Sequence, residues 1–312
     1  MDAESAIFGL IQGAALLFLS PLVIGIVRKC KATFQSRRGA SIIQPYYELA
    51  KQFSKGQVIS RQASWIFRVA PYVCMTCVVL AVTMIPVFIT ASFDYFGNIL
   101  VLVSLMAMYR FFMALSALDT GSSFGGMGSS REVMISAIME PTMFLSIFAM
   151  AAITQTTFLS GIAEAIQSQA SNLLHPSLYL AFFAFFIVML GENARFPFDN
   201  PTTHLELTMV HEAMILEYSG KSLGLMEYSS WTKLTIFLAL LVNMFFPWGI
   251  ATSISLWGIV SGICAFLGKI IVLAIVIALL ESSISKFRLF KLPALSWIAF
   301  CLAFMAVILS FL

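Results

Sequence analysis

Residues 255–280 read SLWGIVSGICAFLGKIIVLAIVIALL, a run in which Lys269 is the only charged side chain. A helix that crosses a bilayer needs about 20 consecutive, mainly apolar residues. The whole chain has this character, since its 312 residues are 60% hydrophobic and 11% charged, against about 25% charged in soluble domains. The apolar stretches are continuous and do not alternate, which argues against a β-barrel. We therefore predict an all-α integral membrane protein that forms one domain, residues 1–312.

Eight apolar segments are long enough to span the bilayer, at residues 6–27, 69–90, 96–117, 133–155, 177–192, 232–250, 255–280 and 294–312. Between them lie four polar connections, at residues 28–68, 118–132, 193–233 and 281–293. All but two of the 18 Lys and Arg residues fall in these connections, and the exceptions are Arg110 and Lys269. Because positive charge marks cytoplasmic loops, we expect the connections in the cytoplasm and both termini outside.

The first connection contains an amphipathic pattern at residues 41–55. Apolar residues such as Ile42, Tyr46 and Leu49 recur at helical spacing, and charged or polar residues fill the other positions. The pattern predicts a helix that lies in the membrane interface. Two uses stay open for it, contact with anionic lipid or docking of a soluble partner.

Several ionisable residues are predicted at membrane depth or at its edge, where charge is costly and therefore a functional candidate. They are Arg110, Asp119, Arg131, Glu132, Glu140, Lys269 and Glu281. Glu140 has no basic residue within a helical turn, and Pro141 follows it. We expect Glu140 to be protonated or to face water, and to take part in proton movement or gating.

The segment Gly191–Gly220, GENARFPFDNPTTHLELTMVHEAMILEYSG, collects five acids and one base between two apolar spans. The acids are Glu192, Asp199, Glu206, Glu212 and Glu217, and the base is Arg195. Its prolines predict a bent loop, followed by a helix at residues 205–219 that Gly220 caps. The acids form either a solvated face or a proton path. His204 and His211 lack a clear third ligand for a zinc site.

Other functional classes find no support in the sequence. The Ser/Gly-rich stretch Asp119–Glu132 lacks the spacing of a phosphate-binding loop, and no nucleic-acid partner is expected. The five cysteines have no iron–sulfur spacing. A self-sufficient transporter would show an internal repeat, and the polar cluster at residues 192–220 has no counterpart in the first half.

Three motifs carry a family resemblance that covers the whole chain. They are FQSRRGASIIQPYYELAKQF at residues 34–53, ALSALDTGSSFGGMGSSREVMISAIMEP at 114–141, and GENARFPFDNPTTHLEL at 191–207 with LEYSG at 216–220. The chain resembles the membrane-anchor subunit shared by respiratory complex I and the energy-converting (group 4) nickel–iron hydrogenases. The middle motif looks like the formate hydrogenlyase and hydrogenase-4 branch. Thr202 and His204 stand where complex I relatives often carry acids.

The resemblance implies a non-redox subunit that contains no catalytic residue, cofactor or metal. The nickel–iron site and iron–sulfur clusters are expected in hydrogenase-like large and small cytoplasmic subunits, with antiporter-like subunits beside the chain in a prokaryotic inner membrane. The implied docking residues are Arg37, Arg38, Gln44, Tyr46 and Tyr47. The implied proton path consists of Asp119, Glu132, Glu140, Glu192, Asp199, Glu206, Glu212, Glu217, Lys269 and Glu281, with Arg110, Arg131 and Arg195 as structural charge partners.

Two related alternatives stay open. The chain could be the quinone-binding membrane subunit of a complex I-type NADH dehydrogenase. It could also be the same anchor in a hydrogenase-related complex that lacks the nickel site.

Overall fold

A computed structural model describes residues 3–90, 97–168, 175–199, 209–251, 255–284, 287 and 291–311. Over these ranges the chain forms eleven helices and no strand beyond two isolated bridges, which confirms the predicted fold class. The helices are α1 (Ala3–Phe34), α2 (Gln44–Ser54), α3 (Trp65–Met84), α4 (Ile99–Asp119), α5 (Ser123–Thr154), α6 (Leu159–Ser168), α8 (Pro176–Glu192), α9 (His211–Ile215), α10 (Gly220–Phe245), α11 (Leu256–Ser283) and α12 (Leu292–Ser310).

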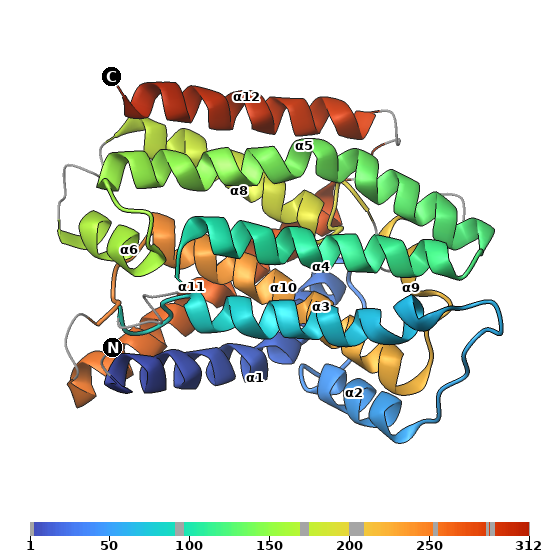
Figure 1. Cartoon of the computed structure of the whole chain (residues 1–312). Coiled ribbons are helices and arrows are strands. Elements are labelled where there is room, and N and C mark those ends of the chain that lie inside the picture. Colours follow the sequence, from blue (N-terminus) through green and yellow to red (C-terminus); the bar gives the residue numbers. More distant parts are fainter. Residues whose placement is uncertain are drawn as a thin grey trace.

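Seven of these helices are long and apolar enough to cross a membrane, namely α1, α3, α4, α5, α10, α11 and α12, and α8 is a shorter apolar helix. The axes of these helices are roughly aligned across the molecule (Figure 1). The short helix α6 lies at one end of the bundle, and α2 and α9 lie at the other. We call these the α6 end and the α9 end. The chain is a multi-pass membrane protein.

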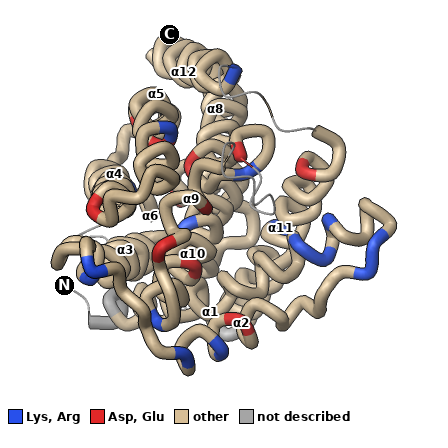
Figure 2. The backbone as a smooth tube through the Cα atoms, turned by 90° about the vertical axis from the view of Figure 1, so that its right-hand side faces the viewer, with Lys and Arg blue, Asp and Glu red and all other residues tan. Residues whose placement is uncertain are grey.

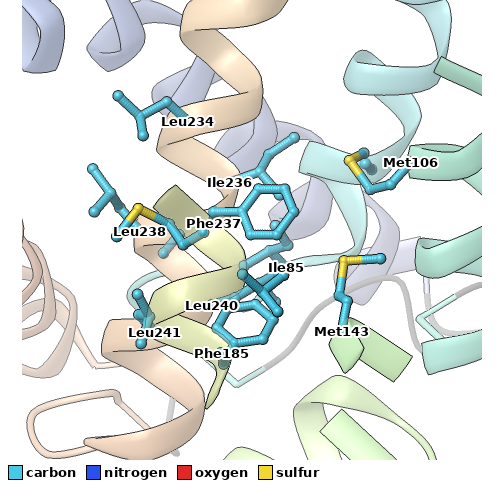
Figure 3. Packing of buried hydrophobic residues seen from close by; sticks show 14 of the residues in the cluster. Ile85, Met106, Met143, Phe185, Leu234, Ile236, Phe237, Leu238, Leu240 and Leu241 are labelled. Atoms are coloured by element: carbon cyan, nitrogen blue, oxygen red, sulfur yellow. The ribbon is translucent and has the colours of Figure 1, made fainter. Parts of the chain in front are cut away.

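The helix α10 forms the centre of the bundle. Every residue from Trp231 to Phe245 is buried, and α10 contacts α1, α2, α3, α6, α8 and α11. In its apolar half, the ring of Phe237 stacks on that of Phe185 from α8, with 5.7 Å between centroids, and Met106 and Met143 lie across from them (Figure 3). A helix buried on all sides forces any charged residue in it to find a partner inside the protein.

Two helices begin ten or more residues earlier than the sequence predicts. The expected connection 118–132 is mostly helical because α5 starts at Ser123, and the expected connection 193–233 ends at Gly220, where α10 starts. Glycines weaken helices, yet those at the start of α5 allow close packing. A Cβ on Gly128 would lie 2.8 Å from that of Ala213 and 2.9 Å from the carbonyl oxygen of Val210.

The predicted helix at residues 205–219 is wrong in extent. The described part of this region contains only the five residues of α9, and residues 200–208 lie outside the described ranges. Gly220 does not cap a helix end but opens α10 with a positive φ of 53°. A Cβ there would lie 2.3 Å from the carbonyl oxygen of Gly56, so the tight approach of the segment after α2 requires glycine.

The predicted span 69–90 also ends early, since α3 stops at Met84 ahead of Pro86. In the non-helical segment that follows, two buried side chains form hydrogen bonds with the backbone N–H and carbonyl groups. The Gln12 Oε1 atom accepts hydrogen bonds from the N–H groups of Val87, Phe88 and Ile89, and Asn243 donates to the carbonyls of Pro86 and Val87. Irregular backbone at membrane depth is tolerated where protein groups satisfy it in this way.

Candidate functional site: a buried chain of ion pairs

The interior of the bundle holds an arginine that is shared between two carboxylates. Arg110 of α4 pairs through Nη2 with Glu192 at the end of α8, and its Nη1 lies 2.9 Å from Glu140 Oε1 on α5. The Arg110 and Glu192 side chains are almost fully buried, whereas that of Glu140 is 35% exposed. The prediction that Glu140 is protonated or water-facing overlooked this partner, because α4 and α5 meet in space and not along one helix.

Lys233 of α10 is the second cation of this group, and sequence reasoning missed it. Its Nζ lies 3.1 Å from Glu192 Oε2, donates to the Glu192 carbonyl at 2.8 Å, and lies 5.0 Å from the ring centroid of Tyr109. Because the sequence predicted a connection over residues 193–233, Lys233 was assigned to a loop. The absence of proline between Gly220 and Phe245 was the signal for one continuous helix.

Glu132 of α5 completes the group, which we call the inner cluster: Arg110, Glu132, Glu140, Glu192 and Lys233. Glu132 is buried and interacts electrostatically with both cations. The inner cluster therefore contains three carboxyl groups and two bases.

A polar cavity of about 370 Å³ lies beside the inner cluster, towards the α9 end. In its wall, Glu281 of α11 joins Lys31 of α1 at 3.0 Å and Arg195 at 3.1 Å. Lys31 also lies 4.9 Å from the ring centroid of Phe196. The other ionisable residues that line the cavity are Arg28, Asp199, His211, Glu212 and Glu227. Lys31, Arg28 and Glu227 had not been singled out from the sequence.

The short helix α9 brings two titratable groups to this cavity. Asp199 fixes its start by accepting hydrogen bonds from the N–H groups of Val210 and His211, at 2.9 and 3.3 Å. Burial, with the nearby Lys233 charge, lowers the pKa of His211 to about 4. Burial, with the carboxylates of Glu227 and Asp199, raises the pKa of Glu212 to about 7. At neutral pH the His211 imidazole is therefore uncharged, whereas the Glu212 carboxyl group titrates near neutrality and can take up or release a proton.

The cavity and the inner cluster are adjacent and interact electrostatically. Glu192 ends α8, and Arg195 follows three residues later in the cavity wall. The charge of Lys233 acts on His211 across the boundary, and that of Asp199 acts on Glu132. Figure 2 looks onto the α9 end and shows acidic and basic positions among α5, α8, α9 and α10. Charged groups thus run from the cavity to Glu140 on α5.

Other predicted path residues, and the predicted charge partner Arg131, lie apart from this chain of charges. The Asp119 carboxylate accepts hydrogen bonds from the N–H groups of Ser64 and Phe67 at the start of α3, and Arg131 donates to the carbonyl of Met209. Glu217 is exposed, and Lys269 donates to the carbonyl of Phe246 near the α6 end. Glu206 falls outside the described residues.

The predicted docking residues are divided between surface and interior contacts. Arg37, Arg38 and Tyr47 are exposed and Gln44 is half-buried, whereas the Tyr46 hydroxyl donates to the carbonyl of Phe18. α2 is fastened to α10 by a 2.8 Å hydrogen bond between Gln52 and Glu227. Arg28 of α1 adds a 2.8 Å ion pair with Glu48 of α2. One face of α2 is therefore held by the bundle, and the other carries Tyr47.

These features define a multi-pass membrane protein with charged groups in its interior and a polar cavity at one end of the bundle. Residues 7–311 match the NADH dehydrogenase family (NADHdh), and the chain belongs to that family. It is 32% identical to formate hydrogenlyase subunit 4 of Escherichia coli K12 over 97% of this chain and 98% of the relative. It is 33% identical to hydrogenase-4 component C of the same organism, over 98% and 96%.

More distant relatives belong to the quinone-reducing branch. An NADH-quinone oxidoreductase subunit from Anaplasma phagocytophilum is 24% identical over 88% of this chain and 85% of its own length. A chain of an archaeal respiratory membrane complex, the membrane-bound sulfane sulfur reductase, has the same fold, with a TM-score of 0.84, 20% identity and 98% coverage of both chains. The protein is therefore a membrane subunit of a complex I-like complex.

Proposed function

We propose that the chain anchors a hydrogenase-like cytoplasmic arm and couples electron transfer in that arm to the translocation of protons or sodium ions. The hydrogenase branch is supported by 32–33% identity over almost the full chain to the formate hydrogenlyase and hydrogenase-4 subunits. The NADH-quinone oxidoreductase subunits, which would support a quinone-binding role, match at 24–26%. The nickel–iron site and iron–sulfur clusters belong, in this proposal, to the arm.

The observation that carries the coupling role is the succession of charged groups from the polar cavity, through the adjacent inner cluster, to Glu140. Redox turnover in the arm alters the charge or hydration near the cavity wall, where Glu212 titrates close to neutral pH. A proton gained there changes the balance of the Glu281 and Glu192 ion pairs. Arg110, shared between Glu192 and Glu140, passes the change on to Glu140.

Glu140 suits the last position of this chain because its side chain is one-third exposed on a membrane-spanning helix. A carboxylate that faces lipid is unfavourable, so an adjacent polar surface supports its exposure. The antiporter-like membrane subunits are the partner that we assign to this face. At the α9 end, the exposed guanidinium groups of Arg37 and Arg38 and the free face of α2 support docking of the arm.

The test is Glu140→Gln in the assembled complex, in membrane vesicles that evolve hydrogen. We expect the arm to stay bound and hydrogen evolution to continue, while ion translocation per turnover falls at least fivefold. Glu164→Gln, which removes an exposed acid of α6, is the matched control and should leave translocation unchanged. Translocation at the wild-type ratio in Glu140→Gln would falsify the coupling role.

A further inference from the structure

A second cavity, of about 630 Å³, lies between α8, α10 and α11 towards the α6 end. Its walls are apolar and include Phe182, Leu241, Val272 and Leu273. The volume is within the 300–1,000 Å³ that small-molecule sites occupy. The cavity shares no residue with the polar cavity that opens at the other end of the bundle. Its composition fits a hydrocarbon chain.

One cation interrupts this apolar wall. The Lys269 ammonium donates to the Phe246 carbonyl at 2.6 Å, and none of the ion pairs among the described residues includes it. An ammonium group has three donor positions, and one carbonyl uses only one of them. A half-buried cation beside apolar walls is stabilised by an anion. The lining therefore suits a ligand that is both apolar and negatively charged.

The residues around Lys269 indicate how the cavity lies in the membrane. Trp248 lines the same cavity, is 58% exposed, and has its ring centroid 5.6 Å from that of Phe246. Tryptophan concentrates at the level of the lipid headgroups, and Phe246 directly follows the last residue of α10. The cavity therefore extends from the headgroup level at Trp248 inwards to the Lys269 ammonium, which reaches back to the Phe246 carbonyl, while Val272 and Leu273 extend the wall towards the hydrocarbon.

We infer that this cavity binds an anionic phospholipid, with one acyl chain between α8, α10 and α11 and the phosphate paired with Lys269. This lipid site is independent of the proposed coupling path. It assigns Lys269 to lipid binding and no longer to the proton path that the sequence predicted. Gly268 lines the cavity, and a Cβ added there would meet no atom within 4 Å, so the space beside Lys269 is open to a chain. Cys264 lies one helical turn before Gly268 on α11. Its thiol is exposed, and it also lines the cavity.

Cys264 offers a direct test. The intact complex is placed in nanodiscs of phosphatidylcholine alone or of phosphatidylcholine with phosphatidylglycerol, and thiol alkylation is followed by peptide mass spectrometry. We expect phosphatidylglycerol to slow the alkylation of Cys264 at least threefold. Cys301, an exposed thiol on α12, is the internal control and should react at one rate in both lipids.

Two variants separate the charge from the cavity. Lys269→Met should abolish the effect of phosphatidylglycerol on Cys264, and Lys269→Arg should retain it. An effect that survives in Lys269→Met overturns the assignment, as do equal Cys264 rates in the two nanodiscs of the wild type. Protection of Cys264 that persists in both lipids and after delipidation would mean that a protein neighbour fills the cavity, which also overturns it.

Discussion

Arg110 and Glu192 form an ion pair that is almost wholly withdrawn from water, with side chains 4% and 1% exposed. The pair joins α4 to the end of α8, and each member has a second partner, Glu140 for Arg110 and Lys233 for Glu192. Removing one member of such a group leaves opposite charges buried without compensation. We therefore expect these four residues to stabilise the bundle as a unit, and single substitutions test this expectation.

The first prediction concerns stability. Glu192→Leu leaves Lys233 without its carboxylate and Arg110 with only Glu140, so we expect a loss of about 3–5 kcal/mol in the free energy of unfolding. Glu48→Leu removes one member of the exposed pair with Arg28 and should cost only about 0–1 kcal/mol. Thermal unfolding of both variants in detergent measures the difference. Equal losses would show that the inner cluster does not stabilise the bundle.

The second prediction concerns pH. The Glu212 pKa rises from 4.5 in the unfolded chain to about 7 when folded, so its contribution to stability is present at low pH and is lost as pH rises through 7. The His211 pKa falls from 6.5 to about 4, so its contribution is present above pH 6.5 and is lost as pH falls. Between pH 4.5 and 6.5 the two trends oppose each other, and the wild-type stability should change little.

Replacing either Glu212 or His211 should reveal the pH dependence of stability that the other residue contributes. Glu212→Gln should make stability rise with pH between 4.5 and 6.5, by roughly 0.5–1 kcal/mol per pH unit once solvent screening is included. His211→Gln should make it fall over the same window. Thermal midpoints at several pH values measure both slopes, with Glu217→Gln as an exposed control. Parallel curves for all four proteins would contradict the opposed titrations.

The third prediction concerns the irregular backbone after α3. Gln12→Leu leaves the N–H groups of Val87, Phe88 and Ile89 without their acceptor, and unsatisfied buried donors cost about 1–3 kcal/mol each. We expect a total loss of about 2–4 kcal/mol after local relaxation, and a smaller loss for Gln12→Glu, which keeps an acceptor. The exposed Gln35→Leu is the control in thermal unfolding. A Gln12→Leu midpoint equal to that of the control would refute this role.

The sequence could predict the apolar helices because hydropathy is a property of each segment alone. Each predicted span overlaps one helix, and the amphipathic pattern at residues 41–55 corresponds to α2. Glu140 shows where that approach stops. Its partner Arg110 lies thirty positions earlier in the chain, and the contact depends on how α4 and α5 pack.

Helix ends were predicted less well, for a related reason. Local preference favours a loop at the glycines before Arg131 and a helix up to Gly220, yet packing decides both places. Gly125 and Gly128 of α5 sit where backbone carbonyl groups come close, and Gly220 accommodates the Gly56 carbonyl. Lys233 was missed because the polar start of α10 conceals a continuous helix. The functional roles of the site residues stay predictions.

Gly128 has a mechanical consequence. No side chain separates α5 from α9 at this point, since a Cβ would collide with Ala213 and with the Val210 carbonyl. This contact lies about 6 Å along α5 from Glu132 and about 18 Å from Glu140. A partner that displaces α9 would therefore press directly on the backbone of the helix that carries both carboxylates.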